Sequence, residues 1–171
     1  MKRNISRRSS PNTTLDGCIW KTAARSTEKV MQLCEDVLDK RLRIYGDEHA
    51  YTLDTIDILA AAYNKEGHYA KAVKLNREVL EKRIRIQGGE HPETLTTMHN
   101  LAFSFRDQGY DAKALLLEED VLDKRRKILG NEHPDTVFMM QDLASRYREQ
   151  GRITDAIALE SEIQEIKQNC N

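Results

Sequence analysis

The chain has 171 residues, enough for one domain or a short array of repeats, of which 39% are hydrophobic and 32% charged. The net charge is −1, but residues 1–27 hold six basic side chains against one acid, so the remainder is acidic. An acidic folded part disfavours nucleic-acid binding, which depends on clustered Lys and Arg. No apolar run approaches the roughly 20 residues of a membrane span, so we expect no membrane partner.

Residues 1–27 are basic and polar, and we expect them to form a poorly ordered N-terminal segment. They contain no apolar stretch of the kind that a secretory signal carries. Cys18, Cys34 and Cys170 are odd in number, scattered and without a CxxC pair, which argues against a disulfide framework or a zinc site. Together these features favour a cytoplasmic location.

Residues 28–45, "EKVMQLCEDVLDKRLRIY", are predicted to form a lone helix. Its apolar positions recur 42 residues later, where Leu33 aligns with Leu75 and Val37 with Val79. Those later residues belong to the second helix of a helix pair, described next. The first helix of such a pair is not recognisable in residues 11–25, so 28–45 is a second helix without its partner.

Three blocks of 42 residues follow, at 46–87, 88–129 and 130–171. In each block, apolar residues spaced by 3 and 4 (such as Ile56, Leu59 and Tyr63) predict one buried stripe along a helix. A glycine then interrupts the pattern, and a second apolar stretch runs for about 18 residues without Gly or Pro. Each block is therefore predicted to be a helix, a tight turn and a second helix.

The motif "GNEHPDT" at 130–136 recurs as "GGEHPET" at 88–94 and "GDEHAYT" at 46–52. Gly130 is expected just past the end of a helix, where a left-handed conformation is needed. Pro134 fits the first position of the next helix, because its missing N–H costs nothing there. His133 precedes this proline, so it is expected to be extended and to cap the helix or pack in the turn.

The same histidine column could suggest a metal site formed by His49, His91 and His133. Metal ligands must surround one ion at about 2 Å, whereas equivalent positions of stacked helix pairs lie roughly 10–20 Å apart. No catalytic arrangement follows from the residue spacing, and the "GG" at 88–89 lacks the Lys-Ser/Thr of a phosphate loop. We therefore predict no metal, no cofactor and no catalytic activity.

A Leu-Ala pair, an aromatic residue three positions later, a Gly four beyond it and an Ala five further on resemble the tetratricopeptide repeat. The period of 42 instead of the usual 34, the "LGxxHP" between units and an "NLA" in the first helix are similar to the repeats of kinesin light chains. Residues 91–136 match best, and the resemblance covers about 28–171. HEAT and armadillo repeats have a similar period but lack this glycine column.

The resemblance implies an all-α fold, a right-handed superhelical α-solenoid of antiparallel helix pairs, whose first helices line a groove for a partner peptide. The groove positions flank the Leu-Ala pair. They are Asp54, Asp57, Ile58, Ala61 and Asn64 in the first block; Thr96, His99, Asn100, Phe103 and Arg106 in the second; and Phe138, Gln141, Asp142, Ser145 and Arg148 in the third.

Two features of these positions bear on the ligand. The family's Asn before Leu-Ala, which can hold a ligand backbone, is present only as Asn100. Chaperone-binding members clamp a terminal carboxylate with basic residues, but Phe138 and Asp142 occupy such positions here. Phe103 and Phe138 would anchor an apolar side chain of the ligand, or else pack against neighbouring second helices.

The sequence thus predicts a non-catalytic scaffold that binds a peptide or protein. The alternative is a structural or self-associating segment of a larger signalling protein, which would join end to end through uncapped terminal repeats. Concentration-dependent mass would distinguish the two. RNA binding by helical repeats is a third hypothesis, and it would require a basic groove.

Overall fold

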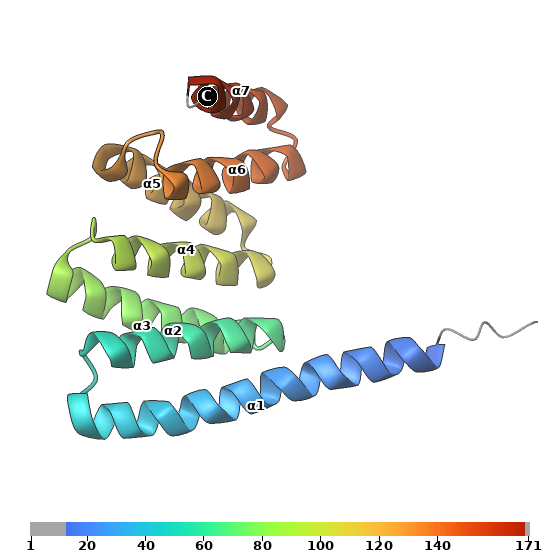
Figure 1. Ribbon diagram of the computed structural model, residues 1–171, viewed down its shortest axis with the longest axis vertical. Helices are drawn as coiled ribbons and strands as arrows, with labels where there is room; N and C mark the ends of the chain where they lie inside the picture. Colours follow the sequence, from blue (N-terminus) through green and yellow to red (C-terminus); the bar gives the residue numbers. More distant parts are fainter. Residues whose placement is uncertain (1–12, 170–171) are drawn as a thin grey trace, which may run out of the picture.

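The computed structural model describes residues 13–169, with side chains for residues 27–168. The described residues form helices and connecting turns, without a strand. Figure 1 shows the helices stacked in chain order along the long axis, from the first at one end to the last at the other. They are α1 (Thr13–Tyr45), α2 (Ala50–Lys65), α3 (Tyr69–Gln87), α4 (Pro92–Asp107), α5 (Asp111–Leu129), α6 (Pro134–Glu149) and α7 (Ile153–Asn169).

The three predicted helix pairs are confirmed as α2–α3, α4–α5 and α6–α7. Each pair also packs on the next, because α3 contacts α4 and α5 contacts α6. Ala72, Ala114 and Ala156 recur 42 residues apart, and each is completely buried. A missing side chain at these points lets neighbouring helices approach closely. The buried apolar residues form two clusters, a smaller one of Leu53, Ile56 and Val79 and a larger one that extends from Leu95 to Ile163.

The histidine motif ends one helix and begins the next. His49, His91 and His133 are the N-caps of α2, α4 and α6. Each imidazole Nδ1 accepts a hydrogen bond from the backbone N–H two residues on, at 3.2, 3.3 and 3.1 Å respectively. Gly130 follows α5 with φ of +86°, a conformation that glycine tolerates best. The capping role predicted for this motif is confirmed.

The N-terminal helix is longer than the sequence predicts. A poorly ordered segment was expected to reach residue 27, whereas α1 begins at Thr13 and crosses residue 28 without a break. From Thr13 to Tyr45 the chain has no Pro and one Gly, Gly17, whose cost of about 1 kcal/mol the rest of the helix tolerates. The division of the chain at residue 28 stays a prediction, and residues 1–12 lie outside the described residues.

Candidate functional site

The candidate site is the face of the stack formed by α2, α4 and α6. On this face Phe103 and Phe138 are 42% and 54% exposed, so neither is a core residue. The guanidinium of Arg106 lies 3.8 Å from the centre of the Phe103 ring and stacks over it. Two aromatic side chains of adjacent repeats are thus available to a ligand, as the groove interpretation requires.

A pocket of about 410 Å³ opens where α2, α3 and α4 meet. Its walls include Ala61, Asn64, Asn100 and Phe103, which the sequence assigned to the groove. Lys65 and Asp107 add charged groups to the lining, and α3 adds a residue that the sequence reasoning missed, Asn76. This pocket, defined here as the Asn64–Phe103 pocket, joins predicted positions from two repeats.

A buried hydrogen-bond cluster supports one side of this pocket. The Ser104 hydroxyl accepts from Asn64 Nδ2 at 2.7 Å and from Asn76 Nδ2 at 2.9 Å, and it donates to the Asn100 carbonyl oxygen at 2.9 Å. Asn64, Asn76 and Ser104 come from three different helices and are each less than 8% exposed. The cluster fixes the two amides in place, because buried polar groups hold their hydrogen-bond partners strongly.

The equivalent place one repeat further is filled by charged side chains. Arg106, Glu118 and Arg146 stand 42 residues after Asn64, Asn76 and Ser104. Arg146 Nε lies 3.4 Å from Glu118 Oε2. Burial raises the pKa of Glu118 to about 7, although the positive charge of Arg106 opposes this shift. An ion pair with a second arginine nearby thus replaces the amide cluster at the equivalent point of the repeat.

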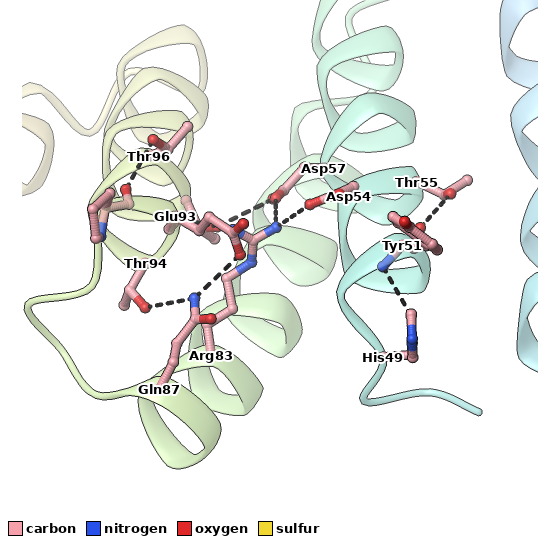
Figure 2. A network of polar contacts seen from close by, with 12 residues as sticks. His49, Tyr51, Asp54, Thr55, Asp57, Arg83, Gln87, Glu93, Thr94 and Thr96 are labelled. Atoms are coloured by element: carbon pink, nitrogen blue, oxygen red, sulfur yellow. Dashed lines mark hydrogen bonds and ion pairs between the residues drawn. The ribbon is translucent and has the colours of Figure 1, made fainter. Parts of the chain in front are cut away.

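At the other end of α2 and α4 an ion-pair network surrounds Arg83 of α3 (Figure 2). Arg83 is 3% exposed, and its Nη2 lies 2.7 Å from Asp54 Oδ1 and 2.9 Å from Asp57 Oδ2. Its Nη1 lies 3.4 Å from Glu93 Oε2 on α4. Asp54 and Asp57 therefore bind a buried guanidinium of their own chain and join α2 to the next repeat through it.

Asp57 also accepts a hydrogen bond from Thr97 Oγ1 at 3.3 Å. Burial raises the pKa of Asp57 to about 6, more than Arg83 and Thr97 lower it. Asp57 is mostly buried, whereas about half of the Asp54 side chain faces solvent. Of this predicted pair, Asp54 is thus the residue that a ligand can reach.

The remaining predicted positions are divided among several local environments. His99 Nε2 lies 3.5 Å from Asp142 Oδ2, which links α4 to α6, and burial lowers the pKa of His99. Gln141, Ser145 and Arg148 line a hollow of about 330 Å³ between α6 and α7. There Arg148 donates two hydrogen bonds to Glu160, at 2.7 and 2.6 Å.

Ile58 and Thr96 lie outside the Asn64–Phe103 pocket. Ile58 is 55% exposed and lines a cavity of about 220 Å³ between α1 and α2. Thr96 is exposed, and its hydroxyl donates to the Pro92 carbonyl oxygen at 3.0 Å. The fifteen predicted positions thus do not form one continuous site, and the Asn64–Phe103 pocket is where they converge.

Three residues of this region were not predicted from the sequence, namely Asn76, Arg83 and Ser104. Their positions in the repeat nevertheless show a recognisable pattern. Asn76 is aligned with Glu118 and Glu160, and Ser104 with Arg146, so these columns change from uncharged to charged. Arg83 is aligned with Arg41 and Arg125, a basic residue within an apolar stripe. A polar residue that recurs in a buried column indicates contacts between repeats, but its partner cannot be identified from the pattern.

Comparison with known proteins identifies the repeat. Residues 51–127 match the family model described as tetratricopeptide repeat. A solved structure from Podospora anserina, of a candidate kinesin light chain with nearly identical TPR-like repeats, is 27% identical. It matches 88% of this chain and 71% of its own length, with a TM-score of 0.71. A variant of that protein is also 27% identical, matching 87% and 70% of the two chains, with a TM-score of 0.73.

A more distant structure, BtubC (BKLC) from P. vanneervenii, is 18% identical and supports the fold alone. It matches 84% of this chain and 57% of its own length, with a TM-score of 0.73. No curated protein sequence matches the chain. The predicted resemblance to tetratricopeptide repeats of the kinesin light chain type is confirmed, and the fold is the right-handed, all-α solenoid that it implies.

Among the described residues, no helix is both long and apolar enough to cross a membrane.

Proposed function

We propose that this array is a non-catalytic scaffold whose α2, α4 and α6 face forms a groove for a peptide segment of a protein partner. Tetratricopeptide repeats in general mediate protein–protein interaction. The observation that carries the proposal is the Asn64–Phe103 pocket, which is mostly apolar, includes the amide residue Asn100 and the exposed ring of Phe103, and has contributions from two repeats. This is the composition of a ligand pocket, mostly apolar with a few convergent polar groups.

Asn100 is the central residue of the proposed groove. Its side-chain amide makes no hydrogen bond with any described residue, although its backbone carbonyl accepts from Ser104 and Asn76. An amide can donate and accept at once, so it can pair with the backbone N–H and C=O of an extended peptide. Phe103 beside it supplies apolar area for a ligand side chain.

The proposal includes a cytoplasmic location and a protein ligand in preference to nucleic acid. The cysteines, which are odd in number and scattered without a CxxC pair, support the location. The groove face mixes the acids Asp54, Glu93 and Asp142 with the bases Arg106 and Arg148, so it is not the uniformly basic surface that a phosphate backbone requires. The matched repeats are of a scaffold type, which supports the assignment as a non-enzyme.

The experiment is selection of random displayed peptides on the full chain. We expect peptides that bind the wild type and fail to bind Asn100→Ala/Phe103→Ala, because this variant removes the amide and the aromatic wall. Leu116→Ala is the matched control, since Leu116 is 67% exposed and lines a hollow between α3 and α5 instead of the groove. Peptides that bind all three proteins equally would show that the groove is not the working surface.

Self-association is a second candidate, favoured by the exposed face of α1. Leu33 is 64% exposed, whereas Leu75, its equivalent one repeat later, packs against the core cluster of Leu53, Ile56 and Val79. Self-association through this face predicts a mass that rises with concentration in sedimentation equilibrium and returns to monomer in Leu33→Lys. A constant monomer mass for the wild type would exclude this candidate.

A further inference from the structure

The aromatic wall of the Asn64–Phe103 pocket is supported by an arginine that few other contacts fix. The Arg106 guanidinium lies 3.8 Å from the centre of the Phe103 ring, and Arg106 is not among the residues that line the pocket. It therefore supports the ring from outside the pocket. Its hydrogen bond with a described residue runs from Nε to Oδ1 of the neighbouring Asp107, at 3.4 Å. The two terminal nitrogens of Arg106 have no hydrogen-bond partner among the described residues, so this side chain can change position.

A buried carboxyl lies close enough to attract the same guanidinium. Arg106, Glu118 and Arg146 occupy positions at which, one repeat earlier, three polar side chains meet at 2.7 and 2.9 Å. Arg106 and Glu118 thus extend to one place between the helices. Among the described residues, Arg106 forms an ion pair with Asp107 alone, so no direct ion pair joins it to Glu118. Its positive charge nevertheless lowers the pKa of Glu118 more than any other neighbouring charge does.

The surroundings of Glu118 leave its charged form poorly neutralised. Glu118 is 3% exposed, and its Oε2 receives no hydrogen bond from a described residue. Its helix, α5, packs against α4 and α6. The charged groups that face it from these three helices are Arg106, Asp111, Asp142, Arg146 and Glu149. Arg146 lies 3.4 Å away through Nε, but its Nη1 binds Glu149 at 2.9 Å. One shared arginine among several acids does not compensate a buried carboxylate.

The position of Arg106 in the structure is the one expected while Glu118 is protonated. A neutral carboxyl attracts a guanidinium weakly, whereas the face of an aromatic ring attracts it at any pH. Burial raises the pKa of Glu118 to about 7, so the carboxyl loses its proton to solvent above that pH. A buried carboxylate then requires a cation, because leaving it unpaired is strongly unfavourable. Arg106 is the nearby cation whose terminal nitrogens are available.

We propose that Arg106 has two positions, one stacked on Phe103 while Glu118 is protonated and one paired with the Glu118 carboxylate, so that proton release from Glu118 removes the support of the pocket wall and weakens peptide binding. The inference rests on the proposed function, because it concerns regulation of the same groove. Glu118 does not line the pocket, so it is a positioning residue that acts on the ligand through Arg106 and Phe103.

The direct test is an NMR titration of the full chain between pH 5 and pH 8 that follows the side-chain protons of Arg106. Protons above an aromatic ring are shifted upfield, so these signals should be shifted at pH 5 and should return to ordinary positions with a midpoint near pH 7. The side-chain carboxyl carbon of Glu118 should titrate with the same midpoint. Arg106 signals that stay constant, or a Glu118 carboxyl that titrates near its ordinary pKa of 4.5, would overturn the inference.

Three variants identify the group that moves Arg106. Glu118→Gln removes the titrating group at nearly constant size, so Arg106 should remain on the ring at every pH. Phe103→Leu removes the ring and should leave the Arg106 signals unshifted at every pH. Glu160→Gln is the matched control, because Glu160 is the equivalent residue one repeat later and pairs with Arg148 instead. A transition that persists in Glu118→Gln would contradict the inference. Should that variant fail to fold, the Glu118 carboxyl signal of the wild type decides.

The effect on binding is measured with a peptide that depends on Asn100 and Phe103 and contains no Asp, Glu or His. The wild type should bind it roughly three- to tenfold more weakly at pH 8 than at pH 5, because an unsupported ring must be ordered on binding. Glu118→Gln should bind it equally at both pH values. A wild type that also binds equally would refute the inference and leave the groove intact. A pH-dependent Arg106 without any groove-dependent peptide would instead refute the proposed function.

Discussion

At the residue scale, one second-helix position can be compared three times within this chain. Asn76 sits in a buried amide cluster, Glu118 in a buried cluster with two arginines, and Glu160 in an ion pair with Arg148 at the surface. Burial raises the pKa of Glu118 to about 7, whereas the Arg148 guanidinium lowers that of the exposed Glu160. The environment, and not the residue type, decides how each carboxylate titrates.

The Glu118 carboxyl predicts a pH dependence of stability. Its pKa is 4.5 when unperturbed and about 7 in the folded chain, so the folded state holds the proton more tightly. Its contribution to stability is complete below pH 4.5 and is lost as the pH rises through 7. The free energy of unfolding in urea should therefore change in favour of Glu118→Gln as the pH rises. The difference between the variant and the wild type should be about 1–3 kcal/mol larger at pH 8 than at pH 5.

The substitution also removes the contact with Arg146, which lowers the free energy of unfolding by a constant amount at both pH values. Subtracting the results at pH 5 from those at pH 8 cancels this amount. Glu160→Gln is the matched control, because its carboxylate is half exposed and its pKa is shifted downward. An equal difference between Glu118→Gln and the wild type at both pH values would contradict the raised pKa.

At the element scale, the helices differ in how many neighbours cover them. Among the described residues, α3 packs between α2 and α4, whereas α7 contacts α6 alone and α1 contacts α2 alone. The apolar side of α7 that would meet a further helix is open, and Ile157 is 51% exposed where the equivalent Leu115 is 8% exposed. The ends of the stack thus lack about half of the packing that the inner helices have.

Amide hydrogen exchange should reveal this difference. Residues 153–168 of α7 are expected to exchange about ten- to a hundredfold faster than residues 69–86 of α3, because opening a helix held on one side breaks fewer contacts. The measurement is mass-spectrometric or NMR exchange on the full chain at constant pH. Equal protection of the two helices would refute this account and indicate that another surface covers α7.

The helices themselves were largely predictable, because their signals are local. The glycine column, the prolines and the apolar spacing predicted the boundaries of α3 through α6 closely. The caps at His91 and His133 followed from the proline after each of them, and that at His49, which precedes Ala50, followed from the recurrence of the motif. The start of α1 was not predictable in the same way. Residues 13–27 lack the repeat pattern and contain Gly17, so the sequence signal for a helix there is only the absence of proline after residue 12.

At the scale of the whole molecule, the site was predictable only in part. Ala61, Asn64, Asn100 and Phe103 were assigned to the groove and do line one pocket. The Arg83 network and the Ser104 cluster were not predictable, because each joins side chains from helices up to 40 residues apart. Such contacts depend on the offset between neighbouring helix pairs, which the period of the sequence does not specify.

The helix pairs share one repeated motif, but the side chains where successive pairs meet differ from one repeat to the next. Where α2, α3 and α4 meet, the Arg83 network lies beside the Asn64–Phe103 pocket. Where α4, α5 and α6 meet, the equivalent place is filled by Arg106, Glu118 and Arg146. A ligand that lies along α2, α4 and α6 would therefore meet a different set of groups at each repeat. Repeat proteins gain specificity from such variation on a constant frame.

Peptide binding by the face of α2, α4 and α6 is proposed to depend on Asn100 and Phe103. The most direct measurement is the dissociation constant of one selected peptide for the wild type and for Asn100→Ala/Phe103→Ala, by titration calorimetry. We expect a loss of about 2–4 kcal/mol of binding free energy, roughly thirtyfold to a thousandfold in affinity, with both proteins equally folded. An unchanged dissociation constant in the folded variant would contradict it.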